Sequence, residues 1–145
     1  MRISAAIGLA LALTTASVQA APKAPAADAN LFVYRTHTDF GWAASLKVDG
    51  TNVASLGNGA YTATRLSPGE HVLTLGWPMT SGFRSIDTSV TVEPGKIYYF
   101  EIRGLDQRYM TGLMVGARIA ASLAPTEETA APAAIAQCCA FRPPK

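Results

Sequence analysis

Cysteine is scarce in this sequence, and its only two cysteines, Cys138 and Cys139, are adjacent. Adjacent cysteines can bond to each other only through a strained eight-membered ring, so no disulfide can join distant parts of the chain. In an oxidising compartment the pair can form that vicinal bridge, bond to another chain or stay reduced. We expect a fraction of the protein to form a disulfide-linked dimer, and the fold itself must depend on its hydrophobic core.

The sequence also has little net charge. Twelve basic residues face ten acidic ones, which gives a net charge of +2, and the basic residues lie singly along the chain. A chain this close to neutrality lacks the electrostatic footprint of a nucleic-acid binder. No run of Lys and Arg predicts a patch for acidic lipid either.

Only two histidines occur, His37 and His71. On a strand, His37 and Asp39 would share a face, but two ligands are too few for a metal site without a third such as His71. No Gly-x-Ser-x-Gly motif, phosphate-binding loop or dinucleotide fingerprint is present. We therefore expect no catalytic, cofactor or metal site, and keep as an alternative a metal-binding or hydrolytic protein that uses His37, Asp39 and His71.

Long apolar runs are confined to the N-terminus. Arg2 precedes an apolar stretch from Ile3 to Leu13, and Val18 and Ala20 satisfy the small-residue rule of signal peptidase. This pattern predicts a cleaved signal peptide over residues 1–20 and a chain exported to the periplasm, although full secretion gives the same pattern. No later segment is long and apolar enough to span a bilayer, so we expect no transmembrane segment after cleavage.

The rest of the chain shows alternation with period two, interrupted by Gly and Pro. Asp49-Gly50 favours a tight hairpin turn, and two Pro-Gly pairs favour further turns. Eight short strands are expected: Leu31–Arg35, Ala44–Val48, Val53–Leu56, Tyr61–Leu66, Val72–Trp77, Ile86–Val92, Ile97–Arg103 and Gly112–Ala120. This spacing predicts an all-β fold, an antiparallel β-sandwich of about seven to eight strands.

Composition marks the domain boundaries. Residues 21–30 lack large apolar side chains and are typical of a flexible leader, so we place the sandwich domain at residues 31–123. Residues 124–145 form an Ala- and Pro-rich tail. A helix is expected within Glu127–Cys138, and it must be short because Pro132 is tolerated only in a first turn.

Five short motifs follow one another along residues 31–123: Val33-Tyr34-Arg35, Val48-Asp49-Gly50, Gly59-Ala60-Tyr61, Leu66-Ser67-Pro68-Gly69-Glu70-His71 and Pro94-Gly95-Lys96-Ile97-Tyr98-Tyr99-Phe100. This series resembles a family of small bacterial envelope domains of unknown function, similar in style to PEGA domains. The resemblance implies a compact antiparallel sandwich at the envelope with no known activity. Many similar proteins are lipoproteins with a cysteine directly after the signal. Ala21 stands there instead, which favours a soluble periplasmic protein.

Aromatic residues on strands mostly build the core, but one aromatic-rich segment combines apolar side chains with turn residues. We expect it to be a partner-binding loop, carried by Trp77, Pro78, Met79 and Phe83. The sequence thus predicts an exported, non-enzymatic envelope domain with a binding or structural role, whose partner is an envelope protein, a glycan or a lipid. A further alternative is an accessory domain that stabilises an envelope assembly.

Overall fold

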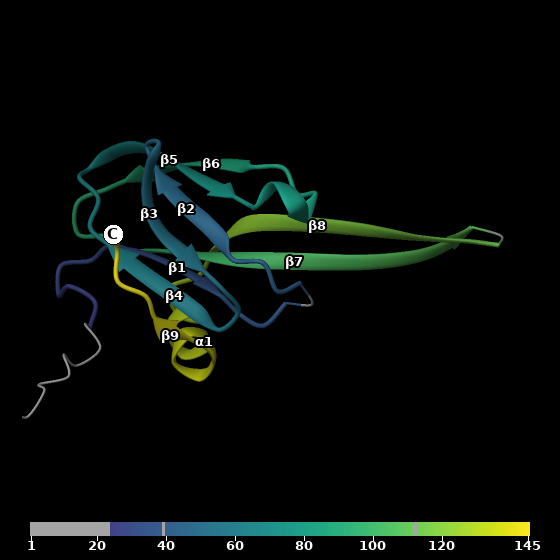
Figure 1. Cartoon of the computed structure of the whole chain (residues 1–145). Coiled ribbons are helices and arrows are strands. Elements are labelled where there is room, and N and C mark those ends of the chain that lie inside the picture. The colour runs from purple at the N-terminus through teal and green to yellow at the C-terminus, as the bar shows by residue number, and fades with distance from the viewer. Residues whose placement is uncertain (1–23, 39, 112) are drawn as a thin grey trace, which may run out of the picture.

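The computed structural model describes residues 24–38, 40–111 and 113–145, so the predicted signal peptide lies outside the described residues (Figure 1). Within them the chain forms nine strands in two sheets, one 3-10 turn and one α-helix. In chain order these are β1 (Leu31–Arg35), β2 (Ala44–Val48), β3 (Thr51–Leu56), β4 (Ala60–Thr64), β5 (Gly69–Gly76), η1 (Met79–Ser81), β6 (Ile86–Val92), β7 (Tyr98–Thr111), β8 (Met114–Thr126), α1 (Ala131–Cys138) and β9 (Ala140–Phe141). The all-β sandwich expected from the sequence is confirmed.

The two sheets differ in strand direction. The first has the order β3-β2-β5-β6 and is antiparallel throughout, whereas the second, β8-β7-β1-β4-β9, is mixed. In the mixed sheet β1 runs parallel to β7, and β4 runs parallel to β9. The predicted antiparallel arrangement therefore holds for the first sheet and is wrong for these two parallel pairs of the second sheet. Alternation with period two is the same in both directions, so the sequence pattern carries no information on strand direction.

The turn predicted at Asp49-Gly50 is confirmed, and Pro94-Gly95 also forms a turn, whereas Gly69 of the other Pro-Gly pair already belongs to β5. Asp49 and Gly50 both have positive φ, 49° and 80°, and they join β2 to β3 as a two-residue hairpin in which Val48 pairs with Thr51. Such a turn needs positive φ at both central positions, and Asp-Gly adopts it readily.

The core lies between the sheets and is built from alternate strand residues. Its fully buried members come from both sheets and include Leu31, Val33, Leu46, Leu56, Leu73, Leu75 and Ile102. Burying a side chain of this size contributes about 1.5–3 kcal/mol relative to leaving it exposed.

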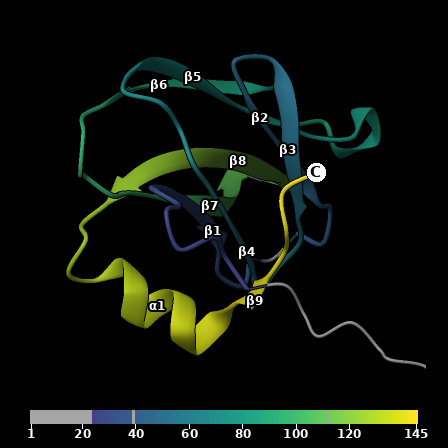
Figure 2. The same ribbon diagram turned by 90° about the vertical axis from the view of Figure 1, so that its left-hand side faces the viewer.

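A second, smaller cluster lies on the outer face of the mixed sheet, where α1 packs below it (Figure 2). Tyr34, on the face of β1 opposite to Val33, is buried against Ala131 and Ile135 of α1. The helix lies within the expected range Glu127–Cys138, is short, and has Pro132 in its first turn. After α1 the chain adds β9 beside β4, so the tail takes part in the sheet. Among the described residues no helix is long and apolar enough to cross a membrane.

The hairpin of β7 and β8 is much longer than the strands expected at Ile97–Arg103 and Gly112–Ala120. Its strands have 14 and 13 residues and pair without a break from Tyr99↔Thr126 to Thr111↔Met114. Gly112 lies outside the described residues. Figure 1 shows the far part of this hairpin projecting well beyond the rest of the molecule. We call residues 105–111 and 113–120 the arm.

Candidate functional site

Arg35 is fully buried at the end of β1, where its period-two position with Leu31 and Val33 directs it between the sheets. Its Nη1 donates to the backbone oxygens of Trp42, at 2.6 Å, and Leu56, at 3.2 Å. Its Nη2 donates to Phe40 O at 2.7 Å and to Thr38 Oγ1 at 2.8 Å. Burial lowers the pKa of the guanidinium, but arginine stays charged in proteins. The charged side chain therefore anchors Thr38, Phe40 and Trp42 and links them to Leu56 of β3.

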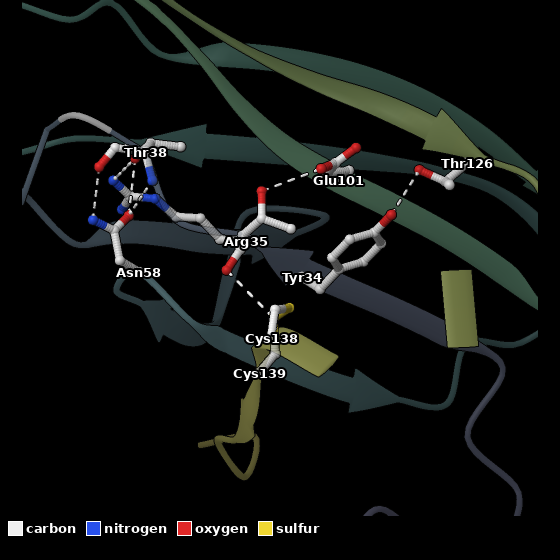
Figure 3. Close-up of a disulfide and its surroundings, with 9 residues drawn as sticks. Tyr34, Arg35, Thr38, Asn58, Glu101, Thr126, Cys138 and Cys139 are labelled. Carbon is white, nitrogen blue, oxygen red and sulfur yellow. Dashed lines mark hydrogen bonds between the residues drawn. A yellow bond between two sulfur atoms is a disulfide. The ribbon is translucent and has the colours of Figure 1, made fainter. Parts of the chain in front are cut away.

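Asn58 completes this network from the turn before β4 (Figure 3). Its Oδ1 accepts from Thr38 Oγ1 at 2.9 Å, and its Nδ2 donates to Thr38 O at 2.9 Å. The amide thus contacts Thr38, the same residue that Arg35 Nη2 binds. Most of these hydrogen bonds end on backbone oxygens, which indicates a structural network.

Four aromatic rings pack against one another next to the arginine: Phe40, Trp42, Trp77 and Phe83, which we call the aromatic cluster. The Arg35 Cζ atom lies 4.8 Å from the centroid of the Phe40 ring and 5.4 Å from that of Trp77. Phe40 also contacts β7, because a Cβ built on Gly104 would lie 2.0 Å from its ring. The aromatic cluster therefore lies at the base of the arm and packs against the point where β7 leaves the sandwich.

The expected partner-binding loop is divided between two environments. Trp77 and Phe83 are half-buried members of the aromatic cluster, whereas Pro78 and Met79 face solvent, Met79 with an exposed fraction of 101%. Gly82, Phe83 and Ile86 line a shallow hollow together with Ala120 and Ala121 of β8. The aromatic side chains of the loop thus pack near the base of the arm, whereas Met79 is exposed to solvent.

The two histidines are not brought together. His37 lies in the loop that leads into β2, while His71 lies beside Asp49, directly after the other end of β2, and Asp39 lies outside the described residues. His71 Nδ1 is 2.7 Å from Asp49 Oδ2, and Nε2 is 2.8 Å from Ser67 O. The hydrogen bond to Asp49 is the larger cause that raises the pKa of His71, and the hydrogen bond to Ser67 adds to it. The hydrogen bond from His71 in turn lowers the pKa of Asp49. No group of three potential metal ligands occurs within the described ranges.

A groove of about 260 Å³ opens on the outer face of the mixed sheet, next to α1. Its walls are aromatic and aliphatic, with Phe32 and Tyr99 stacked at 5.1 Å, and the residues that line it are Phe32, Tyr61, Tyr99, Pro132, Ile135, Ala136 and Cys139. This volume is slightly below the range of pockets for drug-sized ligands, about 300–1,000 Å³.

The cysteine pair lies at the end of this groove. Cys138 and Cys139 form a vicinal disulfide where α1 ends, and Cys139 Sγ lies 3.5 Å from the backbone oxygen of Arg35 (Figure 3). The vicinal bridge is one of the three states that the sequence left open. A bond to a second chain stays a prediction.

The model of one protein family, described as Protein of unknown function (DUF2846), matches residues 25–112, which is more than half of the chain. The chain belongs to this family. In this DUF2846 chain the matched segment runs from before β1 through β7, while α1 and the disulfide follow it. Searches of curated proteins and of solved structures gave no match. The likeness to PEGA-like envelope modules stays a prediction.

Sequence reasoning did not single out Arg35, the aromatic groove or the arm of this DUF2846 chain. Arg35 did leave a signal, because it occupies the inward position after Leu31 and Val33 in a strand with period two. The groove leaves none, since it is formed by residues from β1, β4, β7 and the tail that meet only in the fold.

Proposed function

We propose that this chain is an exported, non-enzymatic interaction domain of the cell envelope, in which the sandwich is a rigid base and the arm binds the partner. The observation that carries the proposal is the projection of the β7–β8 hairpin beyond the sandwich (Figure 1). A long extension of this kind adds surface without enlarging the core, as expected of an element built for contact.

The arm leaves much backbone without a strand partner. The pairing of β1 with β7 ends at Glu101, and β8 is the edge strand of its sheet. Both edges of the arm are therefore open among the described strands. A two-stranded hairpin is only marginally stable alone in water, and open edges readily pair with other chains. These properties favour an arm that is covered by a partner in the assembled state.

The base of the arm is held firmly. Phe40 packs against Gly104, and Arg35 donates three hydrogen bonds to Thr38, Phe40 and Trp42, the residues around that contact. A fixed base lowers the entropy lost when the arm binds. The exported location is supported by the predicted signal peptide and by the resemblance to envelope domains.

A trimmed arm tests the proposal in cells. Residues 107–118 are replaced by Asn-Gly, which rejoins Asp106 and Ile119, two residues that already pair. We expect the full chain, produced with its own signal, to fractionate with the envelope, and the trimmed chain to shift to the soluble exported fraction.

Met79→Asp is the matched control, because Met79 is as exposed as Leu113 of the arm but belongs to η1. It should fractionate as the unchanged chain does. Equal envelope association of the full and trimmed chains would overturn the proposal, whereas loss in the control alone would move the contact to the loop at Met79.

A further inference from the structure

We propose that the partner of the arm is the surface of an anionic lipid bilayer, into which the tip inserts to the depth of the headgroups. This inference rests on the proposed function and names its partner. It is carried by the apolar tip, by two arginines that the register places directly behind it on opposite faces of the hairpin, and by the open edges of the hairpin.

The tip of the arm is apolar and free of charge. Leu113 is exposed to 104%, and no charged residue occurs in residues 109–117, which include Met110, Met114 and Val115. An exposed apolar group at the end of a projection costs free energy in water that burial in an apolar phase recovers. Tyr109 is of a residue type enriched where protein meets the membrane interface.

Two arginines stand directly behind this tip. Arg108 pairs with Ala117, and Arg118 pairs with Gln107, so the two arginines occupy neighbouring register positions on opposite strands. Successive positions alternate between the faces of a hairpin, so one arginine belongs to each face. They are ten residues apart in sequence and therefore form no basic run. Arg108 lies three residues from Thr111, which corresponds to about 10 Å of strand. Interfacial elements bury their apolar face about 5–10 Å deep, which would place the arginines among anionic headgroups.

The shape of the tip favours a bilayer over a protein surface. A specific protein interface buries about 800 Å² on each side, whereas the tip of two strands offers a narrow end. Lipid, being fluid, closes around a narrow insert. Depth is limited by the backbone, because open strand edges cannot enter the hydrocarbon region. The arm is therefore expected to rest in the interface and not to span it.

Vesicle co-sedimentation tests the inference with the exported chain, residues 21–145. We expect binding to vesicles of phosphatidylcholine with phosphatidylglycerol, and little binding to phosphatidylcholine alone. Replacing both Arg108→Gln and Arg118→Gln should weaken binding about 30-fold at low salt, from a contribution per basic residue of about fivefold. Leu113→Asp should weaken it about ten- to a hundredfold.

Met79→Asp serves again as the control and should bind as the unchanged chain does. Equal binding to both kinds of vesicle, no binding to either, or full binding by Leu113→Asp would each overturn the inference. The proposed function fails separately, because it is judged by the fractionation of the trimmed chain. Arm-dependent envelope association without vesicle binding would identify a protein or glycan partner and leave the proposed function standing.

Discussion

Arg35 places a permanent positive charge inside the sandwich, where desolvation is costly. The side chain compensates by donating to four neutral oxygens and by lying over the rings of Phe40 and Trp77. Two of these acceptors, the backbone oxygens of Phe40 and Leu56, are in buried hydrogen bonds. Removing the guanidinium would leave both oxygens without their charged donor. A buried acceptor that loses its donor costs the free energy of its desolvation.

We therefore expect Arg35→Met to lower the free energy of unfolding by about 3–5 kcal/mol. Urea unfolding followed by tryptophan fluorescence measures this change, since Trp77 lies beside Arg35. Arg65→Met is the control, because Arg65 forms an exposed ion pair with Asp28 and should contribute below about 1 kcal/mol. Similar losses in the two variants would show that Arg35 does not stabilise the fold in this way.

His71 makes stability depend on pH in a defined direction. Each ring nitrogen faces an acceptor, Asp49 Oδ2 or Ser67 O, so only the imidazolium can donate to both. The folded-state pKa of His71 is raised above its ordinary 6.5. Its contribution is therefore complete below pH 6.5 and is lost as pH rises through the folded value. The pKa of Asp49 is lowered from its ordinary 3.8, so its contribution is lost only as pH falls through that lowered value.

His71→Gln tests this dependence. The difference in unfolding free energy between the unchanged chain and this variant should be larger at about pH 5.5 than at about pH 8.5. Denaturant titrations at the two pH values measure it. A difference that stays the same at both, or grows towards alkaline pH, would contradict the assignment.

At the scale of elements, local chemistry in the sequence predicts most strands and turns. β1, β2 and β6 have the expected bounds, and Asp49-Gly50 forms the expected turn because its φ requirements are met by those two residues. Long-range pairing is not encoded locally. The parallel pairs β1–β7 and β4–β9 depend on how the chain crosses between sheets, and residues 140–141 are too short a segment to give a strand pattern.

The candidate site was harder to predict than the fold for the same reason. Trp77 and Phe83 led to the prediction of a partner-binding loop, yet the structure packs both rings against Phe40, which lies against Gly104 at the base of the arm. Arg108 and Arg118 appear in the sequence as isolated basic residues, and only the register of the hairpin shows that they lie at neighbouring positions along it, one on each face. Pairing between strands creates proximity that composition and spacing do not contain.

The arm as an element has a measurable length. The trimmed variant ends its ladder at Asp106 and not at Thr111, which shortens the hairpin by five residues per strand. We expect the maximum dimension from small-angle X-ray scattering to fall by about 17 Å, at about 3.4 Å per residue. An unchanged maximum dimension would mean that the arm folds back on the sandwich in solution.

For the whole molecule, the two sheets and the arm have separate tasks. The described core residues of the hairpin, Phe100, Ile102 and Leu123, lie at its sandwich end, so the arm adds little to that core. Stability therefore depends on the sandwich, and the proposed contact depends on the arm. This separation allows the arm to change with little effect on folding.

The order of strands in the mixed sheet has a consequence for how the chain is made. β1 lies at the centre of that sheet, but its parallel partner β7 begins more than sixty residues later, and β9 closes the far edge with residues 140–141. Contacts this distant in sequence form slowly. A chain that leaves the ribosome N-terminus first cannot complete this sheet until residues 140–141 emerge, so the mixed sheet stays open at this edge while the residues before β9 are being made.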